Sequence, residues 1–142
     1  MIDGCSCVVD TSGLHAIATA TENLRTVLLE KLATGIIGVP ACAWQEFVEL
    51  YEDEAPIIVS HVAKKIIMKR SIYVGAARIA EKLNSGFPRG AYDNNTELYT
   101  ASIALNHGVR VLTSMDQKSQ YSKMNCEAID IETWVDELEQ AS

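Results

Sequence analysis

The sequence predicts a Rossmann-like α/β domain: a short central parallel sheet of about four strands, covered by helices on both faces. Two observations predict it. Short apolar runs alternate along the chain with longer segments in which apolar residues recur at helical spacing. The runs at 6–10 and 36–39 contain consecutive apolar residues, CVV and IIGV, which is typical of strands buried on both faces of a parallel sheet. Because the 142 residues contain no internal repeat and no linker rich in Gly, Pro or Ser, we expect one domain over residues 1–142.

The first strand is expected at 6–10, where the sequence reads SCVVD. Thr11 or Ser12 could cap the helix that follows, because both side chains accept hydrogen bonds from free backbone N–H groups. A second helix is expected to open at Thr21, with leucine and valine at helical spacing behind it. Gly35 is a plausible end for that helix, since glycine tolerates the left-handed conformation of a helix terminus.

The middle of the chain predicts a second strand and three helices. The strand is expected at 36–39, and Pro40 suits the first turn of the next helix. That helix carries an apolar stripe, which consists of Trp44, Phe47, Val48 and Tyr51. We expect these aromatic side chains in the core. Two further amphipathic helices are expected at 56–69 and 73–84, packed as a hairpin, before a turn-rich loop at 86–90.

The last third repeats the strand and helix alternation. A helix is expected to start at Asp93 or Asn94 and to end near Gly108. Its apolar residues are Leu98, Ala101, Ala104 and Leu105. The remaining elements are a third strand at 109–113, a polar turn or short helix at 117–123, a fourth strand at 127–131 and a closing helix at 132–139.

Composition excludes several classes of protein. No apolar run approaches the roughly 20 residues that span a bilayer, and no basic leader opens the chain, so we expect neither membrane insertion nor secretion. The four cysteines form no C-x-x-C pair, which argues against a zinc framework and favours reduced thiols in the cytoplasm. The net charge of −7 argues against non-specific nucleic-acid binding by the whole surface.

The basic residues are nevertheless unevenly distributed. Residues 64–89 contain seven of the twelve, against one acid, Glu81. The seven are Lys64, Lys65, Lys69, Arg70, Arg78, Lys82 and Arg89. Such a patch could guide a phosphate backbone toward an acidic, metal-loaded site. The charges alone favour the simpler interpretation, a solvated face of two helices.

Acidic side chains follow or face the carboxyl ends of the predicted strands, where open α/β sheets bind ligands. Asp10 ends the first strand, and Asp116 follows the third. Glu46 lies in the helix after the second strand, and Asp93 and Glu97 open the helix that leads into the third. Clustered carboxylates repel one another unless a hard cation compensates them, and oxygen ligands suit Mg²⁺ or Mn²⁺. Such a cation can activate water and stabilise charge on a phosphodiester.

These residues occur in motifs that resemble PIN-domain nucleases over most of the chain. The motifs are VVDTS at 8–12, VP at 39–40 followed by Glu46, ELYTASIALNHG at 97–108 and VLTSMD at 111–116. Each motif alone has low specificity. Their order and spacing together make the resemblance moderately specific, and residues 55–90 match least.

The resemblance implies a PIN-like fold and a metal-dependent ribonuclease, a hydrolase that is often the toxin of a bacterial toxin–antitoxin pair. RNA would be its substrate and a small antitoxin its partner. Carried over, Asp10 and Asp116 would be metal ligands, and Glu46 a ligand or a base that positions water. Ser12 and Thr113 would hydrogen-bond to the carboxylates.

The third and fourth acidic positions depart from the family pattern. Glu97 stands where the family usually has Asp, so it would be the third catalytic carboxylate and metal ligand with a longer side chain. Asp93 lies one helical turn earlier and could serve as ligand instead or as well. The Thr113–Asp116 spacing is one residue longer than the common one, and Gln117 replaces the aromatic residue that often follows.

These departures leave a second hypothesis, a degenerate PIN-like domain that binds RNA or a protein partner without cleaving. A third, a phosphohydrolase with Asp10 as nucleophile, is disfavoured because Ser12 stands where such enzymes carry a second Asp. Amphipathic segments at 21–34 and 55–84 could contact an antitoxin or a second copy in a homodimer. Asp10 alone would also serve as an ordinary helix cap.

Overall fold

A computed structural model describes residues 5–63, 65–83 and 95–141. Its centre is a five-stranded parallel sheet in the order β3-β2-β1-β4-β5. The strands are β1 (Cys7–Val9), β2 (Ile37–Pro40), β3 (Lys65–Ile66), β4 (Arg110–Thr113) and β5 (Ala128–Asp130). The chain therefore has the α/β fold that the sequence predicted, with one strand more than expected.

The central strand β1 supplies side chains to both faces of the sheet. Cys7, Val8 and Val9 are each 0% exposed. Side chains alternate along a strand, so Cys7 and Val9 pack into one hydrophobic cluster and Val8 into the other. This double burial explains why the run is apolar without alternation.

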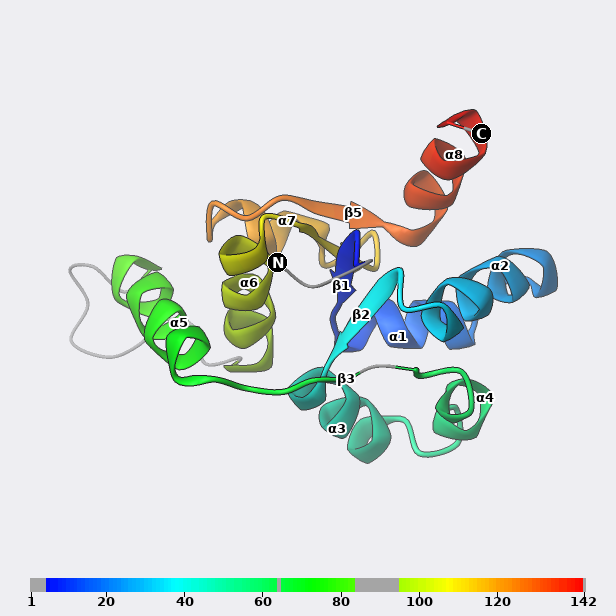
Figure 1. The fold of residues 1–142 in the computed structure, drawn as a ribbon, viewed down its shortest axis with the longest axis horizontal. Coiled ribbons are helices and arrows are strands. Elements are labelled where there is room, and N and C mark those ends of the chain that lie inside the picture. Colours follow the sequence, from blue (N-terminus) through cyan, green and yellow to red (C-terminus); the bar gives the residue numbers. More distant parts are fainter. Residues whose placement is uncertain (1–4, 64, 84–94, 142) are drawn as a thin grey trace.

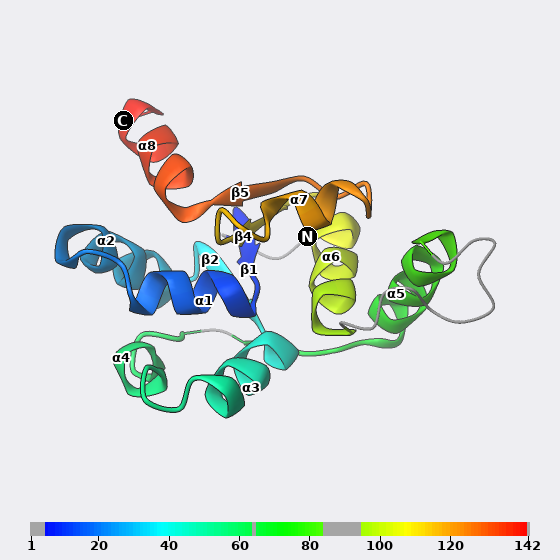
Figure 2. The same cartoon turned by 180° about the vertical axis from the view of Figure 1, so that it is seen from behind.

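Eight helices cover the sheet in the described part of the chain. They are α1 (Thr11–Ala18), α2 (Glu22–Ala33), α3 (Ala41–Leu50), α4 (Ala55–Val59), α5 (Arg70–Leu83), α6 (Asn95–His107), α7 (Lys118–Ser122) and α8 (Ile131–Ala141). Figures 1 and 2 show α6 on one side of the sheet with α5 outside it, and α1 and α2 on the other side. Helix α3 contacts both α1 and α6, so it lies where the two faces meet.

The helical hairpin predicted over 56–69 and 73–84 is wrong. Helix α4 ends at Val59, and the chain then forms β3, which pairs with the edge of β2. The apolar spacing of 56–69 suits a helix, but the exposed edge of β2 provides backbone hydrogen bonds that favour a strand. Helix α5 begins at Arg70 and packs along α6, with Gly75 so close to Ser102 that a Cβ would lie 2.4 Å from its hydroxyl.

Several predicted boundaries are confirmed. Thr21 precedes α2, and Gly35 follows that helix with a φ of 81°. Gly108 ends α6 with a φ of 67°, a conformation that glycine adopts without strain. The predicted loop at 86–90 and the helix start at Asp93 or Asn94 lie outside the described residues. No described helix has the length and apolar character needed to cross a membrane.

Candidate functional site: an acidic pocket at the carboxyl end of the sheet

Asp10 follows β1 directly, and its buried carboxylate accepts a hydrogen bond from four groups. Its side chain is 1% exposed. Oδ1 accepts from the backbone N–H of Gly13 at 2.7 Å and from the hydroxyl of Ser12 at 3.1 Å. Oδ2 accepts from the hydroxyls of Thr113 at 2.8 Å and Tyr121 at 2.6 Å. A carboxylate offers about four lone-pair positions, so these contacts occupy all of them.

Local sequence explains why Asp10 is held in this way. Asp10 is the cap of α1, so the prediction that Thr11 or Ser12 caps the helix is wrong. Its extended backbone lets its own side chain reach back to the N–H of Gly13, as aspartate caps do. Gly13 also allows the helix to approach β4, because a Cβ there would lie 2.5 Å from the carbonyl oxygen of Leu112.

The parallel pairing of β1 with β4 brings Thr113 to Asp10. Val9 lies beside Leu112 in the ladder, so Asp10, which follows β1, and Thr113, the last residue of β4, stand at the same sheet edge. The sheet order reverses at this pair of strands, since β2 and β3 extend to one side of β1 and β4 and β5 to the other. Open α/β sheets bind ligands at such a point. Ser12 and Thr113, which the resemblance placed beside the carboxylates, both donate to that of Asp10.

Glu46 and Glu97 line the same pocket as Asp10. We call it the acidic pocket; its volume is about 190 Å³, and it is lined by Asp10, Thr11, Ser12, Glu46, Leu50, Tyr51, Glu97 and Gln117. Glu46 comes from α3, and its Oε2 accepts a hydrogen bond from the hydroxyl of Thr96 at 3.0 Å. Glu97 comes from the first turn of α6. The fold therefore gathers three of the predicted carboxylates, which lie far apart in the sequence.

Asp116 is not among the residues that line this pocket. Asp116 lies in the turn after β4, where it is exposed, and the side chain from that turn that lines the pocket is Gln117. The longer Thr113–Asp116 spacing is the sequence feature that accompanies this placement. Asp93, the alternative third ligand, lies outside the described residues.

Tyr121 contacts Asp10 directly, and the sequence did not predict this. Its ring is 0% exposed in α7, and its hydroxyl makes the shortest of the four hydrogen bonds to Asp10. A sequence feature that points to Tyr121 lies in the polar segment 117–123, which was predicted only as a turn or short helix. A single aromatic residue among Gln, Ser and Lys marks the side that faces the core.

Burial and hydrogen bonding act on Asp10 in opposite directions. Burial raises the pKa of the Asp10 carboxyl above its usual range, because a low-dielectric environment disfavours the charged form. The hydrogen bonds from Tyr121, Gly13, Thr113 and Ser12 lower this pKa but do not offset burial completely. The pocket thus holds a carboxyl group for which a positive charge nearby would be strongly favourable.

The carboxylate oxygens that line the acidic pocket are of the chemical type that binds a hard divalent cation. Three carboxylates line one pocket, and oxygen ligands suit Mg²⁺ and Mn²⁺. Within the described ranges, however, no three carboxylate, imidazole or thiolate side chains converge as a formed metal site. Four protein groups lie within hydrogen-bond distance of the Asp10 carboxylate.

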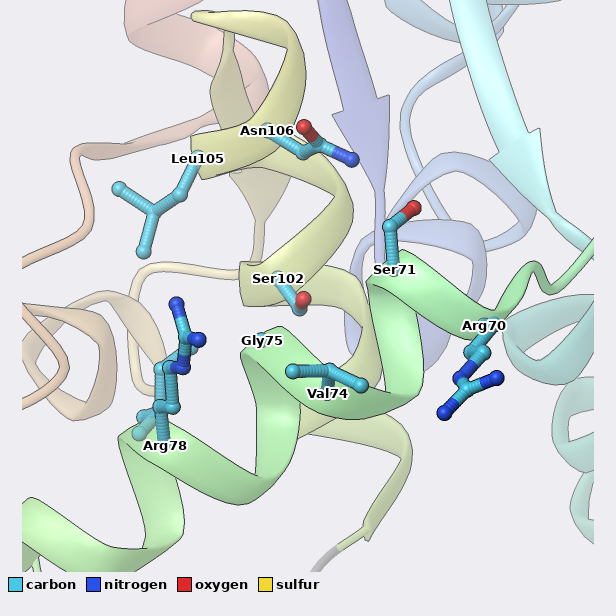
Figure 3. A pocket seen from close by; sticks show the side chains of 9 residues that line it. Arg70, Ser71, Val74, Gly75, Arg78, Ser102, Leu105 and Asn106 are labelled. Carbon is cyan, nitrogen blue, oxygen red and sulfur yellow. The ribbon is translucent and has the colours of Figure 1, made fainter.

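A larger cavity lies apart from the acidic pocket, between α5 and α6 (Figure 3). We call it the α5–α6 groove; its volume is about 620 Å³, and it is lined by Arg70, Ser71, Val74, Gly75, Arg78, Ile79, Ser102, Leu105 and Asn106. Arg70 and Arg78 belong to the predicted basic stretch and are exposed, whereas Lys64 and Arg89 of that stretch lie outside the described residues. No carboxylate is among these described lining residues.

Comparison with known proteins places the fold. No protein-family model matches the chain, and no curated protein matches it by sequence. It is similar to DNA-bound VapBC from Salmonella typhimurium, with a TM-score of 0.66 and 13% identity over 89% of this chain and 98% of that chain. For VapBC2 from Rickettsia felis, bound to a promoter DNA fragment, the TM-score is 0.63 and the identity 16% over 87% and 96%. For PAE2754 from Pyrobaculum aerophilum, the values are 0.60 and 14% over 99% of both chains. These likenesses confirm the PIN-like fold that the sequence motifs predicted.

Proposed function

We propose that this protein is a divalent-metal-dependent endoribonuclease that hydrolyses RNA phosphodiesters. One observation carries the proposal: Asp10, Glu46 and Glu97 come from three separate elements and line a single pocket at the carboxyl end of a PIN-like sheet. Carboxylates gathered in this way carry a repulsive cost that structural stability alone does not require. A hard cation would remove that cost.

In this proposal Asp10, Glu46 and Glu97 would hold Mg²⁺ or Mn²⁺, which supplies an activated water and stabilises charge on the phosphodiester. The chain contributes orientation. The Thr96 hydroxyl fixes Oε2 of Glu46, so the remaining acceptor positions of this carboxylate can orient a water and take its proton. Ser12 and Thr113 fix the plane of the Asp10 carboxylate, which keeps its direction constant when substrate binds.

We further propose that the protein is the toxin of a toxin–antitoxin pair. Support comes from solved structures that share the fold, among which are the toxin–antitoxin complexes VapBC and FitAB. A small antitoxin would then cover the acidic pocket and suppress cleavage. The four cysteines are free, which suits the reducing cytoplasm where RNA substrates are found.

The test is cleavage of a labelled structured RNA by the wild-type protein and by Asp10→Asn, each with Mn²⁺, Mg²⁺ or chelator. We expect cleavage that needs both the cation and Asp10, with the variant slower by at least about a hundredfold. Asp136→Asn is the matched control, because it makes the same change at an exposed position of α8 and should leave the rate unchanged. Equal cleavage by wild type and Asp10→Asn would refute the proposal.

A second candidate function has its own observation. Asp10 has all its lone-pair positions occupied and Asp116 lies outside the pocket, which favours a PIN-like domain that binds RNA or a protein without cleaving. Titration calorimetry with Mn²⁺ separates the two. Stoichiometric binding to the wild-type protein supports the nuclease, whereas RNA binding without any Mn²⁺ binding supports the non-catalytic domain.

A further inference from the structure

We propose that the α5–α6 groove binds an acidic amphipathic helix of a partner protein. The inference goes beyond the proposed function, because the groove shares no lining residue with the acidic pocket. Two properties of the groove carry it: cationic side chains along its length, and exposed aliphatic side chains between them (Figure 3). A helix with an apolar stripe and acidic flanks complements both properties.

The cations of the groove come mainly from α5. Arg70 and Arg78 line the groove, and Lys82 follows Arg78 after one helical turn. Lys82 and Lys123 line a smaller cavity of about 150 Å³, which adjoins the groove because the two share Arg78 among their lining residues. All four cationic residues are exposed. The positive surface therefore extends from the groove to the end of α7.

No acidic side chain offsets these cations among the described residues that line either cavity. Glu81, the one acid of the basic stretch 64–89, is absent from both linings. The ion pairs found in the described part of the chain involve Arg110 and Lys118 instead. Because the whole chain has a net charge of −7, a positive surface of this kind contrasts with its acidic remainder. This contrast favours a negatively charged partner at the groove.

The arrangement of the two arginines indicates an extended partner. Arg70 and Arg78 are eight residues apart in α5, which corresponds to about 12 Å along the helix axis. Figure 3 shows Val74 between them and their guanidinium groups pointing in different directions, so they do not converge on a single small anion. A symmetric contact between two copies of this groove would bring like charges together, which disfavours a second copy as the occupant.

The aliphatic side chains favour a protein helix over an RNA strand. Val74 of α5 is 41% exposed and Leu105 of α6 is 47% exposed, and both line the groove. Burying them against apolar side chains of a partner would be favourable. Single-stranded RNA is recognised largely through bases that stack on aromatic side chains, and no aromatic residue is among the described residues that line the groove.

Helix geometry provides a matching pattern of acids. Every α-helix rises about 1.5 Å per residue, so acids four residues apart on a helix lying along α5 recur at the interval that separates Arg78 from Lys82. The apolar stripe of such a helix would cover Val74 and Leu105, while its acids would lie beside the cations at the edges.

The experiment is fluorescence anisotropy of a labelled synthetic peptide with leucine at helical spacing and glutamate on both flanks. A length of about 18 residues allows the peptide to form a helix. The full-length protein is titrated as wild type, Arg78→Gln, Leu105→Ala and Arg25→Gln at low ionic strength. We expect Arg78→Gln and Leu105→Ala each to weaken binding about fivefold. Arg25→Gln makes the same change on α2, on the other side of the sheet, and should bind like wild type (Figures 1 and 2).

Two further probes separate charge, apolar contact and phosphate as the cause of binding. A peptide with glutamine in place of every glutamate should bind more weakly, and added salt should weaken binding of the acidic peptide. Labelled polyuridine with chelator tests the phosphate backbone as the occupant. Tighter binding of polyuridine than of the acidic peptide would overturn the inference, as would equal peptide binding by wild type and Arg78→Gln or no peptide binding. Circular dichroism of each variant verifies that a loss of binding does not come from unfolding.

Discussion

The acidic pocket and the α5–α6 groove satisfy their polar side chains in opposite ways. In the pocket, Asp10 is almost completely buried and four protein donors surround its carboxylate. In the groove, Arg70 and Arg78 are exposed, and neither takes part in the ion pairs found among the described residues (Figure 3). The two arginines of the groove are exposed to solvent, whereas protein donors surround the buried Asp10 carboxylate of the pocket.

This difference determines how each region responds to change. A buried polar group that loses its partner has no water to replace it, so the penalty is large. An exposed cation that is removed loses only weak, screened interactions. The pocket should therefore be rigid and sensitive to single substitutions. The groove should tolerate them.

The largest expected effect on stability comes from Asp10→Ala. The substitution removes the acceptor of the Gly13 N–H and the Tyr121 hydroxyl inside the core, and we expect it to lower the free energy of unfolding by about 3 kcal/mol. Asp136→Ala makes the same change at an exposed site and should shift it by less than about 0.5 kcal/mol. Urea denaturation of the three proteins in chelator measures both. Equal losses from the two substitutions would show that the pocket is not held by these hydrogen bonds.

The comparison of the acidic pocket with the α5–α6 groove also explains which features of the fold and site the sequence could predict. Asp10 and Thr113 were predicted at the site because strand ends in a parallel sheet meet at one edge. Ser12, Glu46 and Glu97 were predicted there from the order and spacing of the motifs. The central strands were predicted for a related reason, since burial on both faces demands continuous apolar runs.

Features set by packing between distant elements were not predictable in this way. Strand β3 contains two residues and forms because the edge of β2 needs a partner, a requirement absent from the local pattern. The hydrogen bond of Tyr121 to Asp10 depends on where α7 packs relative to the end of β1, and no spacing in the sequence records that placement. The α5–α6 groove likewise results from packing at Gly75 and Ser102.

A smaller effect should appear in the pH dependence of stability. Folding raises the pKa of Asp10, mainly through burial, so the folded state favours the protonated carboxyl more than the unfolded state does. Below the unfolded value, about pH 3.9, this residue carries no penalty. As the pH rises from there through the raised folded value, its contribution becomes progressively unfavourable.

Asp10→Asn isolates this contribution because asparagine does not titrate. The free energy of unfolding of wild type, minus that of Asp10→Asn, should fall as the pH rises above about 3.9 and level off beyond the folded pKa. Urea denaturation at a series of pH values, with chelator present throughout, gives the difference directly. A difference that grows with pH would mean that the hydrogen bonds to Asp10 lower its pKa by more than burial raises it.

The smallest effect is expected in the groove, from Arg78→Gln. Gln has nearly the helix propensity of Arg, so the substitution in α5 changes the charge while leaving the backbone preference intact. Arg78 lies one turn before Lys82, a like charge, and three residues before Glu81, an opposite one, so the local electrostatic terms nearly cancel. We expect the free energy of unfolding to change by less than about 0.5 kcal/mol, with no dependence on salt. A loss above about 1 kcal/mol would show that the guanidinium is anchored in the groove, and the two regions would then differ in charge but not in how tightly they hold their polar groups.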